Sequence, residues 1–378
     1  AHLGARAHCL AERRLLRRGV LQHFDDLEIT VIGQREDVVT GAEPGVETSV
    51  AEPLTEQGTE TLGLRGKPGR SHREGQMIDV HAPIVTICPC GSESSGSGSR
   101  PAVAYHGEVH REPAASPRVV LSTSSVYPES TAAGFALARE LGYDGIEVMV
   151  GVDPASADVD AVERLSEYHE VPVCAIHAPT LLLTQRVWGP DPWEKLDRAA
   201  MAAHQLGAGV VVVHPPFRWQ RSYASGFTEG IRRLEESTGL TFAVENMYPW
   251  RGPGGGEVRA YAPSWDCAAL DVDHLTLDLS HAATARLSSL ELVRDWGERL
   301  SHVHLTDGTN GASDEHLLPG EGDQDAAGVL AELAAVRYTG DVSVEVNTRG
   351  LPRAEREVVL AASLAFARQH LPVPAERT

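Results

Sequence analysis

The stretch Leu277-Asp278-Leu279-Ser280-His281 begins as a short apolar run and ends in an acid and a histidine. Acids are rarely buried unless they are paired or bind a metal, so a strand with this ending suits a metal site better than a core. The same ending recurs along the chain at Ala175-Ile176-His177, Val212-Val213-His214, Val244-Glu245, Val303-His304 and Val344-Glu345.

The region around this stretch alternates between β-like apolar runs and helical spacing over about 260 residues, a typical length for a (β/α)8 barrel. Strands are predicted at 119–121, 145–149, 173–176, 209–213, 241–244, 275–277, 301–305 and 342–344, and helices near 130–141, 158–169, 192–206, 224–237, 264–270, 288–298, 325–336 and 353–369. An open doubly wound sheet is the alternative. It is disfavoured because no glycine-rich phosphate fingerprint follows the first strand.

The first 116 residues differ from the rest of the chain. They include a Gly/Ser-rich stretch at 91–99 and show little periodic apolar pattern. Such a composition is typical of linkers and disordered segments, which do not bury enough apolar surface to fold. We therefore predict a largely disordered extension at 1–116 and a TIM-barrel domain at 117–378.

Composition limits the classes of partner. The formal net charge of −20 repels nucleic acid and anionic membranes over most of the surface. Five cysteines, without a CxxC pair, do not make a disulfide framework. No apolar run has the length of a membrane span, and residues 1–30 lack a secretory apolar segment. The expected location is the cytoplasm; assembly into a homo-oligomer is left open.

In a (β/α)8 barrel the catalytic groups lie at the carboxyl ends of the strands, where residues distant in sequence converge. Imidazole and carboxylate together suit a divalent ion such as manganese, zinc, cobalt or magnesium. The strand ends carry His177, His214, Glu245, Asp278, His304 and Glu345, and the following loops add His281, Asp314 and His316.

Each of these residues has an ordinary alternative when taken singly. A lone histidine such as His177 is more often a hydrogen-bonded core residue, and Asp314 could cap a turn. Their joint placement at strand ends favours the metal site. For Glu147, a structural hydrogen bond and a substrate contact are equally supported. Trp219 and Arg251 lie in loops after the fourth and fifth strands, where they suit substrate binding or plain packing.

Residues 117–378 resemble the xylose-isomerase-like barrel superfamily, which includes sugar-phosphate isomerases and epimerases, inosose dehydratases and DNA repair enzymes of the endonuclease IV type. The resemblance is carried by VEN at 244–246, LDLSH at 277–281, HVHLTDG at 302–308, DEHLLPGEGD at 314–323 and VEV at 344–346. In the sugar enzymes it implies one divalent ion held by Glu, Asp, His and Glu, which fall here on Glu245, Asp278, His304 and Glu345.

The endonuclease branch uses a three-zinc cluster, and its extra ligand positions match His177, His214, His281, Asp314 and His316. The negative net charge of the chain opposes DNA binding. The chain also departs from the pattern of the ketose-epimerase branch at one position. A substrate-binding arginine usually follows the histidine of the seventh strand, and Gly308-Thr309-Asn310 occupies that stretch here.

The resulting hypothesis is a metal-dependent isomerase or epimerase of a sugar, sugar phosphate or inosose. It would act by proton transfer through a metal-stabilised enediolate, with Glu245 and Glu345 as base and acid and His281 as a proton shuttle. The rivals are a zinc-dependent phosphodiesterase acting on abasic DNA and a non-catalytic barrel that holds metal only for stability.

Because residues 1–116 lack a core pattern, a shortened chain that begins at Ser116 should fold and keep any activity. Circular dichroism and thermal unfolding of the two chains would test this boundary. Loss of soluble, cooperatively unfolding protein on shortening would contradict it.

Overall fold

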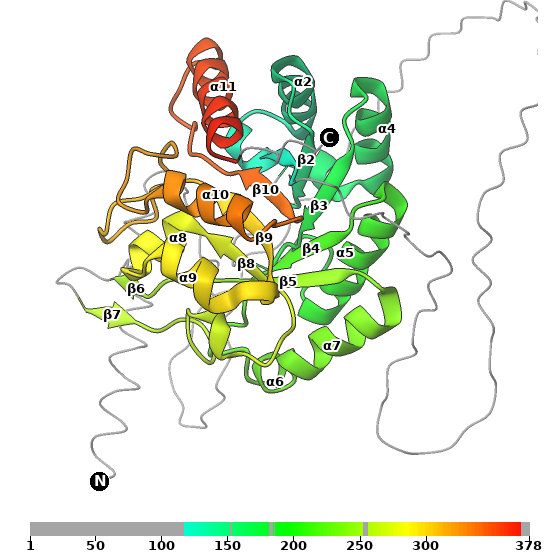
Figure 1. The fold of residues 1–378 in the computed structure, drawn as a ribbon. Helices are drawn as coiled ribbons and strands as arrows, with labels where there is room; N and C mark the ends of the chain where they lie inside the picture. Colours follow the sequence, from blue (N-terminus) through cyan, green and yellow to red (C-terminus); the bar gives the residue numbers. More distant parts are fainter. Residues whose placement is uncertain (1–116, 152, 181–183, 185, 252–255, 372–378) are drawn as a thin grey trace, which may run out of the picture. The chain divides into compact units, whose positions relative to one another are not determined.

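The computed structural model describes residues 117–371, apart from 152, 181–183, 185 and 252–255. Eight strands close into a barrel in which every hydrogen-bonded neighbour is parallel. This confirms the predicted (β/α)8 fold (Figure 1). The strands are β1 (Val119–Ser122), β2 (Gly145–Met149), β3 (Val173–His177), β4 (Val210–Val213), β5 (Thr241–Glu245), β8 (Leu275–Asp278), β9 (Leu300–Leu305) and β10 (Asp341–Val344).

Around the barrel the strands follow the order β1-β10-β9-β8-β5-β4-β3-β2. The strands β5, β8, β9 and β10 are therefore four consecutive neighbours, as their chain order predicts. They are rich in β-branched residues and buried along almost their whole length, as expected for a parallel sheet covered by helices. Their carboxyl ends all open on the same side of the barrel.

The loop after β9 returns to this side of the barrel. The amides of Asp307 and Leu317 each donate to the other's carbonyl, at 3.0 Å and 2.8 Å. The Asp307 carboxylate also accepts hydrogen bonds from the amides of Gly320 and Gln324. These bonds hold the segment 314–316 at the rim where the strands end.

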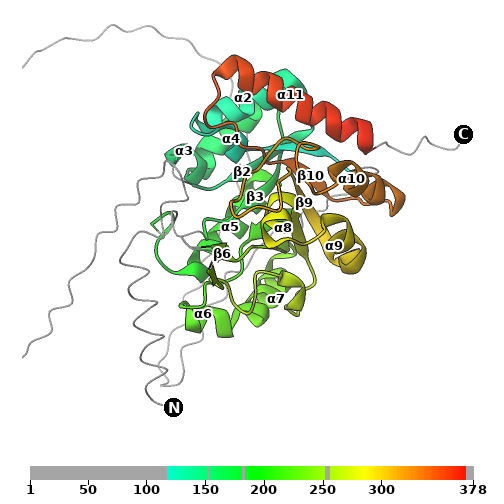
Figure 2. The ribbon, with the colours of Figure 1, turned by 90° about the vertical axis from the view of Figure 1, so that its left-hand side faces the viewer.

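Helices form an outer layer around the strands (Figures 1 and 2). The larger ones are α2 (Thr131–Leu141), α4 (Val159–His169), α5 (Pro192–Leu206), α7 (Phe227–Thr238), α9 (Ser289–Trp296), α10 (Ala326–Ala335) and α11 (Arg353–His370). Gly142 and Gly207 end α2 and α5 in the left-handed conformation, with φ of 81° and 69°. The sequence predicts both ends, because glycine adopts this conformation without steric cost.

The structure corrects the predicted elements at several places. The helix expected near 264–270 is only a 3-10 turn at η3 (Cys267–Ala269), and the helix expected near 224–237 is split into α6 (Arg221–Ser225) and α7. Four short elements were not predicted: α3 (Pro154–Ala157), α8 (Leu279–Ala285), and the antiparallel pair β6 (Trp250–Arg251) and β7 (Glu257–Val258). Each has too few residues for a periodic pattern to be visible.

One prediction concerns a segment that the structure does not describe. Residues 1–116, expected to be a disordered extension, lie outside the described residues, as do 372–378 at the other end. Within the described part of the chain, no helix is long and apolar enough to cross a membrane.

Gly145 opens β2 where this strand approaches β3 closely. A Cβ atom at Gly145 would collide with Cys174 Sγ and lie 2.8 Å from the carbonyl oxygen of Pro172. Gly145→Ala should lower the free energy of unfolding by about 1–3 kcal/mol, because two packed strands must separate. Gly151→Ala is the control, since its nearest contact would be at 3.9 Å. Chemical denaturation measures both; equal stability of the two variants would contradict the close packing.

Candidate metal centre

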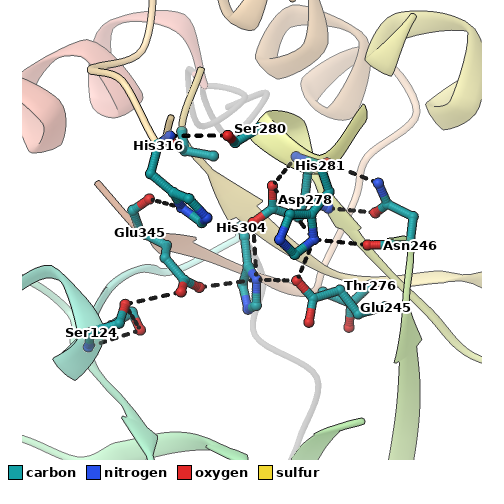
Figure 3. Close-up of polar contacts among 12 residues, drawn as sticks. Ser124, Glu245, Asn246, Thr276, Asp278, Ser280, His281, His304, His316 and Glu345 are labelled. Atoms are coloured by element: carbon teal, nitrogen blue, oxygen red, sulfur yellow. Dashed lines mark hydrogen bonds and ion pairs between the residues drawn. The ribbon is translucent and has the colours of Figure 1, made fainter. Parts of the chain in front are cut away.

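Four neighbouring strands bring three carboxylates to one imidazole. The Nδ1 atom of His304 lies 3.0 Å from Glu345 Oε2, 3.2 Å from Glu245 Oε1 and 3.5 Å from Asp278 Oδ2 (Figure 3). All four side chains are buried. The sequence thus correctly predicted that these residues converge at the carboxyl ends of β5, β8, β9 and β10.

Asp278 is held in place from both flanking elements. It caps α8, where its Oδ1 accepts a 2.7 Å hydrogen bond from the backbone amide of His281. The side chain of Asn246 accepts from the Asp278 amide at 2.7 Å and donates to the Asp278 carbonyl at 3.0 Å. These bonds fix the backbone of Asp278 beside β5 and leave its Oδ2 buried without a hydrogen-bond partner among the described residues.

A second group of possible ligands surrounds the other oxygen of Glu245. The Nε2 atoms of His177 and His214 lie 3.2 Å and 2.8 Å from Glu245 Oε2. His177 ends β3, and His214 directly follows β4. Because Glu245 turns one oxygen to each group, its carboxylate could bridge two ions.

A third group forms around Asp314, where His281 and His316 approach the same oxygen. Their Nε2 atoms lie 3.3 Å and 3.1 Å from Asp314 Oδ2. Each Nδ1 instead faces a backbone carbonyl at 2.8 Å, that of Asn246 for His281 and that of Glu345 for His316. In a neutral imidazole, a carbonyl partner of this kind keeps the proton on Nδ1, so that Nε2 would offer its lone pair to a metal ion.

The charges of these groups strongly influence one another. Burial alone would lower the pKa of His304, but nearby carboxylates, Glu147 and Glu345 foremost, raise that pKa well above its ordinary value. Burial would raise the pKa of Glu245, but His304 and His214 hold it well below the ordinary value. For Glu345 burial prevails, and its pKa is raised despite His304. The two glutamates therefore differ in their affinity for a proton.

The donor set fits a divalent cation. Four sets of ligand atoms lie close enough to hold an ion. Three of them are linked through Glu245 and Asp278: His177, His214 and Glu245; Glu245, Asp278 and His304; and Asp278, His281 and His316. The fourth is Glu147, His302 and His304. Glu345 Oε2, like Asp278 Oδ2, is buried without a hydrogen-bond partner among the described residues. Buried carboxylate oxygens without donors are costly, and a cation would satisfy them.

The predicted substrate residues lie in different surroundings. Glu147 is fully buried against His302 and His304. Trp219 is half exposed and stacks on Phe217 with ring centroids 4.6 Å apart, so a substrate contact stays a prediction.

Arg251 is engaged by protein groups on all sides. Its Nη1 donates to the carbonyls of Thr284 and Gly311, both at 2.7 Å, and its other nitrogens pair with Glu257. Arg251, in β6, therefore joins β7, helix α8 and the loop after β9, and a substrate contact of Arg251 stays a prediction.

Several residues that shape the centre were not singled out from the sequence. Ser280 Oγ donates to Asp314 at 2.6 Å and accepts the amide of His316, while Ser124 Oγ donates to Glu345 Oε1 at 3.0 Å. The side chain of Asn246 donates to the carbonyl of Asp278, and the His302 ring packs edge-on against that of His304, with centroids 5.3 Å apart. Their one available signal was position, since Asn246, Ser280 and His302 each lie within two residues of a predicted ligand.

Comparisons with known proteins agree with the barrel fold. A family model described as xylose isomerase-like TIM barrel matches residues 135–370. A protein of Mycobacterium leprae is 48% identical over 273 residues, which are 67% of this chain and 98% of that protein. The fructoselysine 3-epimerase of Escherichia coli O157:H7 is 24% identical over 249 residues, which are 57% of this chain and 84% of the epimerase.

Solved structures share the barrel at lower identity. A xylose isomerase domain protein of Alicyclobacillus acidocaldarius superposes with a TM-score of 0.52 at 20% identity, covering 68% of this chain and 98% of that protein. The IOLI protein, solved with a bound zinc atom, gives 0.50 at 18% identity, with 67% and 99% covered. At such identities the likeness shows the fold alone.

Metal binding should release protons and strengthen as pH rises. Burial opposes the charged form of His304, but Glu147 and Glu345 raise its pKa well above its ordinary value, so the metal-free side chain holds a proton that a bound metal ion must displace. A metal ligand must be neutral, so each displaced proton should raise affinity by up to about tenfold per pH unit below that pKa.

Calorimetric titration with Zn²⁺ in two buffers of different ionisation enthalpy counts the released protons. His304→Gln should release fewer protons than wild type, whereas His370→Gln, on the outer helix α11, should release the same number. Affinity that does not vary between pH 6 and 8, with no proton release, would contradict this electrostatic description.

Proposed function

Because the chain belongs to the xylose isomerase-like TIM-barrel family, we propose that it is a divalent-metal-dependent isomerase or epimerase of a sugar or a related polyol. The observation that carries the proposal is the convergence of Glu245, Asp278 and Glu345 on His304 at the mouth of the barrel. The 24% identical fructoselysine 3-epimerase supports the substrate class. Residues Glu245, Asp278, His304 and Glu345 would hold the ion.

A divalent ion held there would polarise a substrate carbonyl and so make the neighbouring C–H more acidic. The protein must supply a group that takes and returns that proton. Glu345 suits this role because Ser124 donates a 3.0 Å hydrogen bond to its Oε1, and because its Oε2 faces the centre, 3.0 Å from His304 Nδ1, without a hydrogen-bond partner among the described residues. In the metal-free protein, burial also raises the pKa of Glu345. A base whose pKa lies closer to the working pH transfers protons more efficiently.

Glu245 suits a different role. Neighbouring imidazoles hold its pKa well below the ordinary value, so its carboxylate stays ionised and is a poor acid. Environments that separate the pKa values of two nearby carboxylates commonly divide the work between them. We assign Glu245 to ligand binding alone, and Glu345 to both ligand binding and proton transfer. His281, with Nε2 directed to Asp314, could hold a substrate hydroxyl or a further ion.

One observation favours a second candidate, a metal-dependent phosphodiesterase. The three ligand sets adjoin one another and share Glu245 and Asp278, an arrangement able to hold two or three ions. Clustered ions stabilise both the attacking and the leaving oxygen of a phosphate ester. The net charge of −20 opposes this candidate, because DNA binding depends on neutralising phosphates with basic groups.

The decisive variant is Glu345→Gln, which keeps the shape of the side chain and removes the base. Loss of general-base catalysis should slow solvent deuterium incorporation next to the carbonyl of ketoses, sugar phosphates or inososes by about 10²–10⁴-fold. Mass spectrometry of the substrate measures the exchange with added Mn²⁺, Co²⁺, Mg²⁺ or Zn²⁺. The matched control is Glu355→Gln, the same change at an exposed position of α11.

Equal exchange by wild type and Glu345→Gln would refute the assigned role of Glu345. Elemental analysis of the purified protein separates the two candidates. One ion per chain supports the isomerase, whereas two or three ions together with nicking of an abasic duplex would support the phosphodiesterase. Absence of any bound divalent ion would refute both.

A further inference from the structure

A fourth buried acid, Glu147, lies beside His304 in addition to the three carboxylates of the candidate metal centre. Glu147 is in the middle of β2, and its side chain is fully buried, as are those of His302 and His304. The Nε2 of His302 lies 2.6 Å from Glu147 Oε2, and the Nε2 of His304 lies 3.3 Å from the same oxygen. A buried carboxylate is costly unless it is paired, so this arrangement calls for a physical reason.

The two nitrogens of His304 face different partners. Nδ1 is turned to Glu345, Glu245 and Asp278, whereas Nε2 is turned to Glu147. If Nε2 carries the proton, it donates to Glu147, and the lone pair of Nδ1 is left for a cation. A carboxylate behind a metal-binding imidazole commonly sets the tautomer and the ring orientation in this way.

His302 forms a hydrogen bond with the same carboxylate, that of Glu147. It precedes His304 by two residues on β9, and alternation along a strand directs both side chains to the same face. Its Nδ1 has no hydrogen-bond partner among the described residues, so Nε2 is the nitrogen that acts in this structure. With both imidazoles donating to Oε2, the carboxylate of Glu147 is fixed from two directions.

Neither a second metal ion nor a direct substrate contact fits the surroundings of Glu147 as well. A metal ion between Glu147, His302 and His304 would separate its ligand atoms by about 3 Å or more, since zinc bonds are about 2.0–2.2 Å long. The 2.6 Å between His302 Nε2 and Glu147 Oε2 is instead a hydrogen-bond distance. A direct substrate contact would need an accessible carboxylate, and Glu147 has no exposed surface.

We propose that Glu147 is a positioning residue that holds His304 with Nδ1 toward the metal, and that His302 keeps Glu147 in place. The proposal rests on the metal site of the proposed function but not on its substrate or reaction. Replacing Glu147 should therefore weaken metal binding through His304, even though the ion would not touch Glu147.

Metal affinity of the full chain, measured by chelator competition with Zn²⁺ and Co²⁺, tests this proposal. Glu147→Gln should weaken binding by about 10–100-fold, the usual effect of removing an outer-shell partner. The Co²⁺ absorption bands should shift as well, because the imidazole is no longer held in one orientation. Ser343→Ala is the matched control. This buried hydroxyl lies on β10, the strand that pairs with β9, and it has no hydrogen-bond partner among the described residues.

A pair of substitutions at His302 keeps the test independent of how well Glu147→Gln folds. A glutamine amide can reach the place of Nε2, whereas the shorter asparagine cannot. His302→Gln should therefore retain most of the affinity, and His302→Asn should lose about as much as Glu147→Gln. A merely structural role would lower thermal stability in both variants without this difference in metal affinity.

The double variant Glu147→Gln/His304→Ala separates action through His304 from a general field effect. If Glu147 works by positioning His304, its replacement should cause no further loss of affinity once His304 is absent. An additive loss would overturn the proposal, as would wild-type affinity in Glu147→Gln. In those cases the proposed metal-dependent function would stand, whereas a wild-type protein that binds no divalent ion would overturn both.

Discussion

The mutual repulsion of three buried carboxylates around one imidazole is the constraint on which the candidate site depends. Glu245, Asp278 and Glu345 each approach His304 Nδ1 within 3.5 Å, in surroundings from which water is largely removed. Like charges at such distances interact strongly in a low-dielectric interior. Without an ion, protonated histidines balance them, which explains why the pKa of His304 is raised. A divalent ion would balance them without bound protons.

The barrel makes this concentration of charge possible because the carboxyl ends of its parallel strands all lie on one side. The side chain of Asn246 also links the ends of β5 and β8 through two hydrogen bonds with the backbone of Asp278. Glu245 and Asp278 each serve two ligand sets, so the number of bound ions decides whether Glu245 is a simple ligand or a bridge. A single ion leaves the group around Asp314 available to a polyol substrate, whereas several ions would occupy it and direct the same barrel toward phosphate esters. Under the proposed function, the number of bound ions would therefore distinguish the two candidate reactions.

The sequence alone determined the barrel and the four residues around His304. Strand and helix periodicity are local properties, and parallel strands in chain order place their carboxyl ends together, so six strand-end acids and histidines could be named in advance. The family resemblance then singled out Glu245, Asp278, His304 and Glu345 among them. The nine predicted ligand residues do form one connected cluster in the structure. Short elements such as α8 escaped prediction because seven residues make too few turns to show a period.

Only the tertiary structure decided how these residues are oriented and what supports them. The pairing of Glu147 with His302 and His304 joins strands that are 155 residues apart in sequence, and no local pattern encodes such a contact. The same holds for Arg251, whose guanidinium donates to carbonyls of helix α8 and of the loop after β9. Periodicity reports which face of an element is buried, whereas the direction of each donor and acceptor is set by the partners that folding brings within hydrogen-bond range.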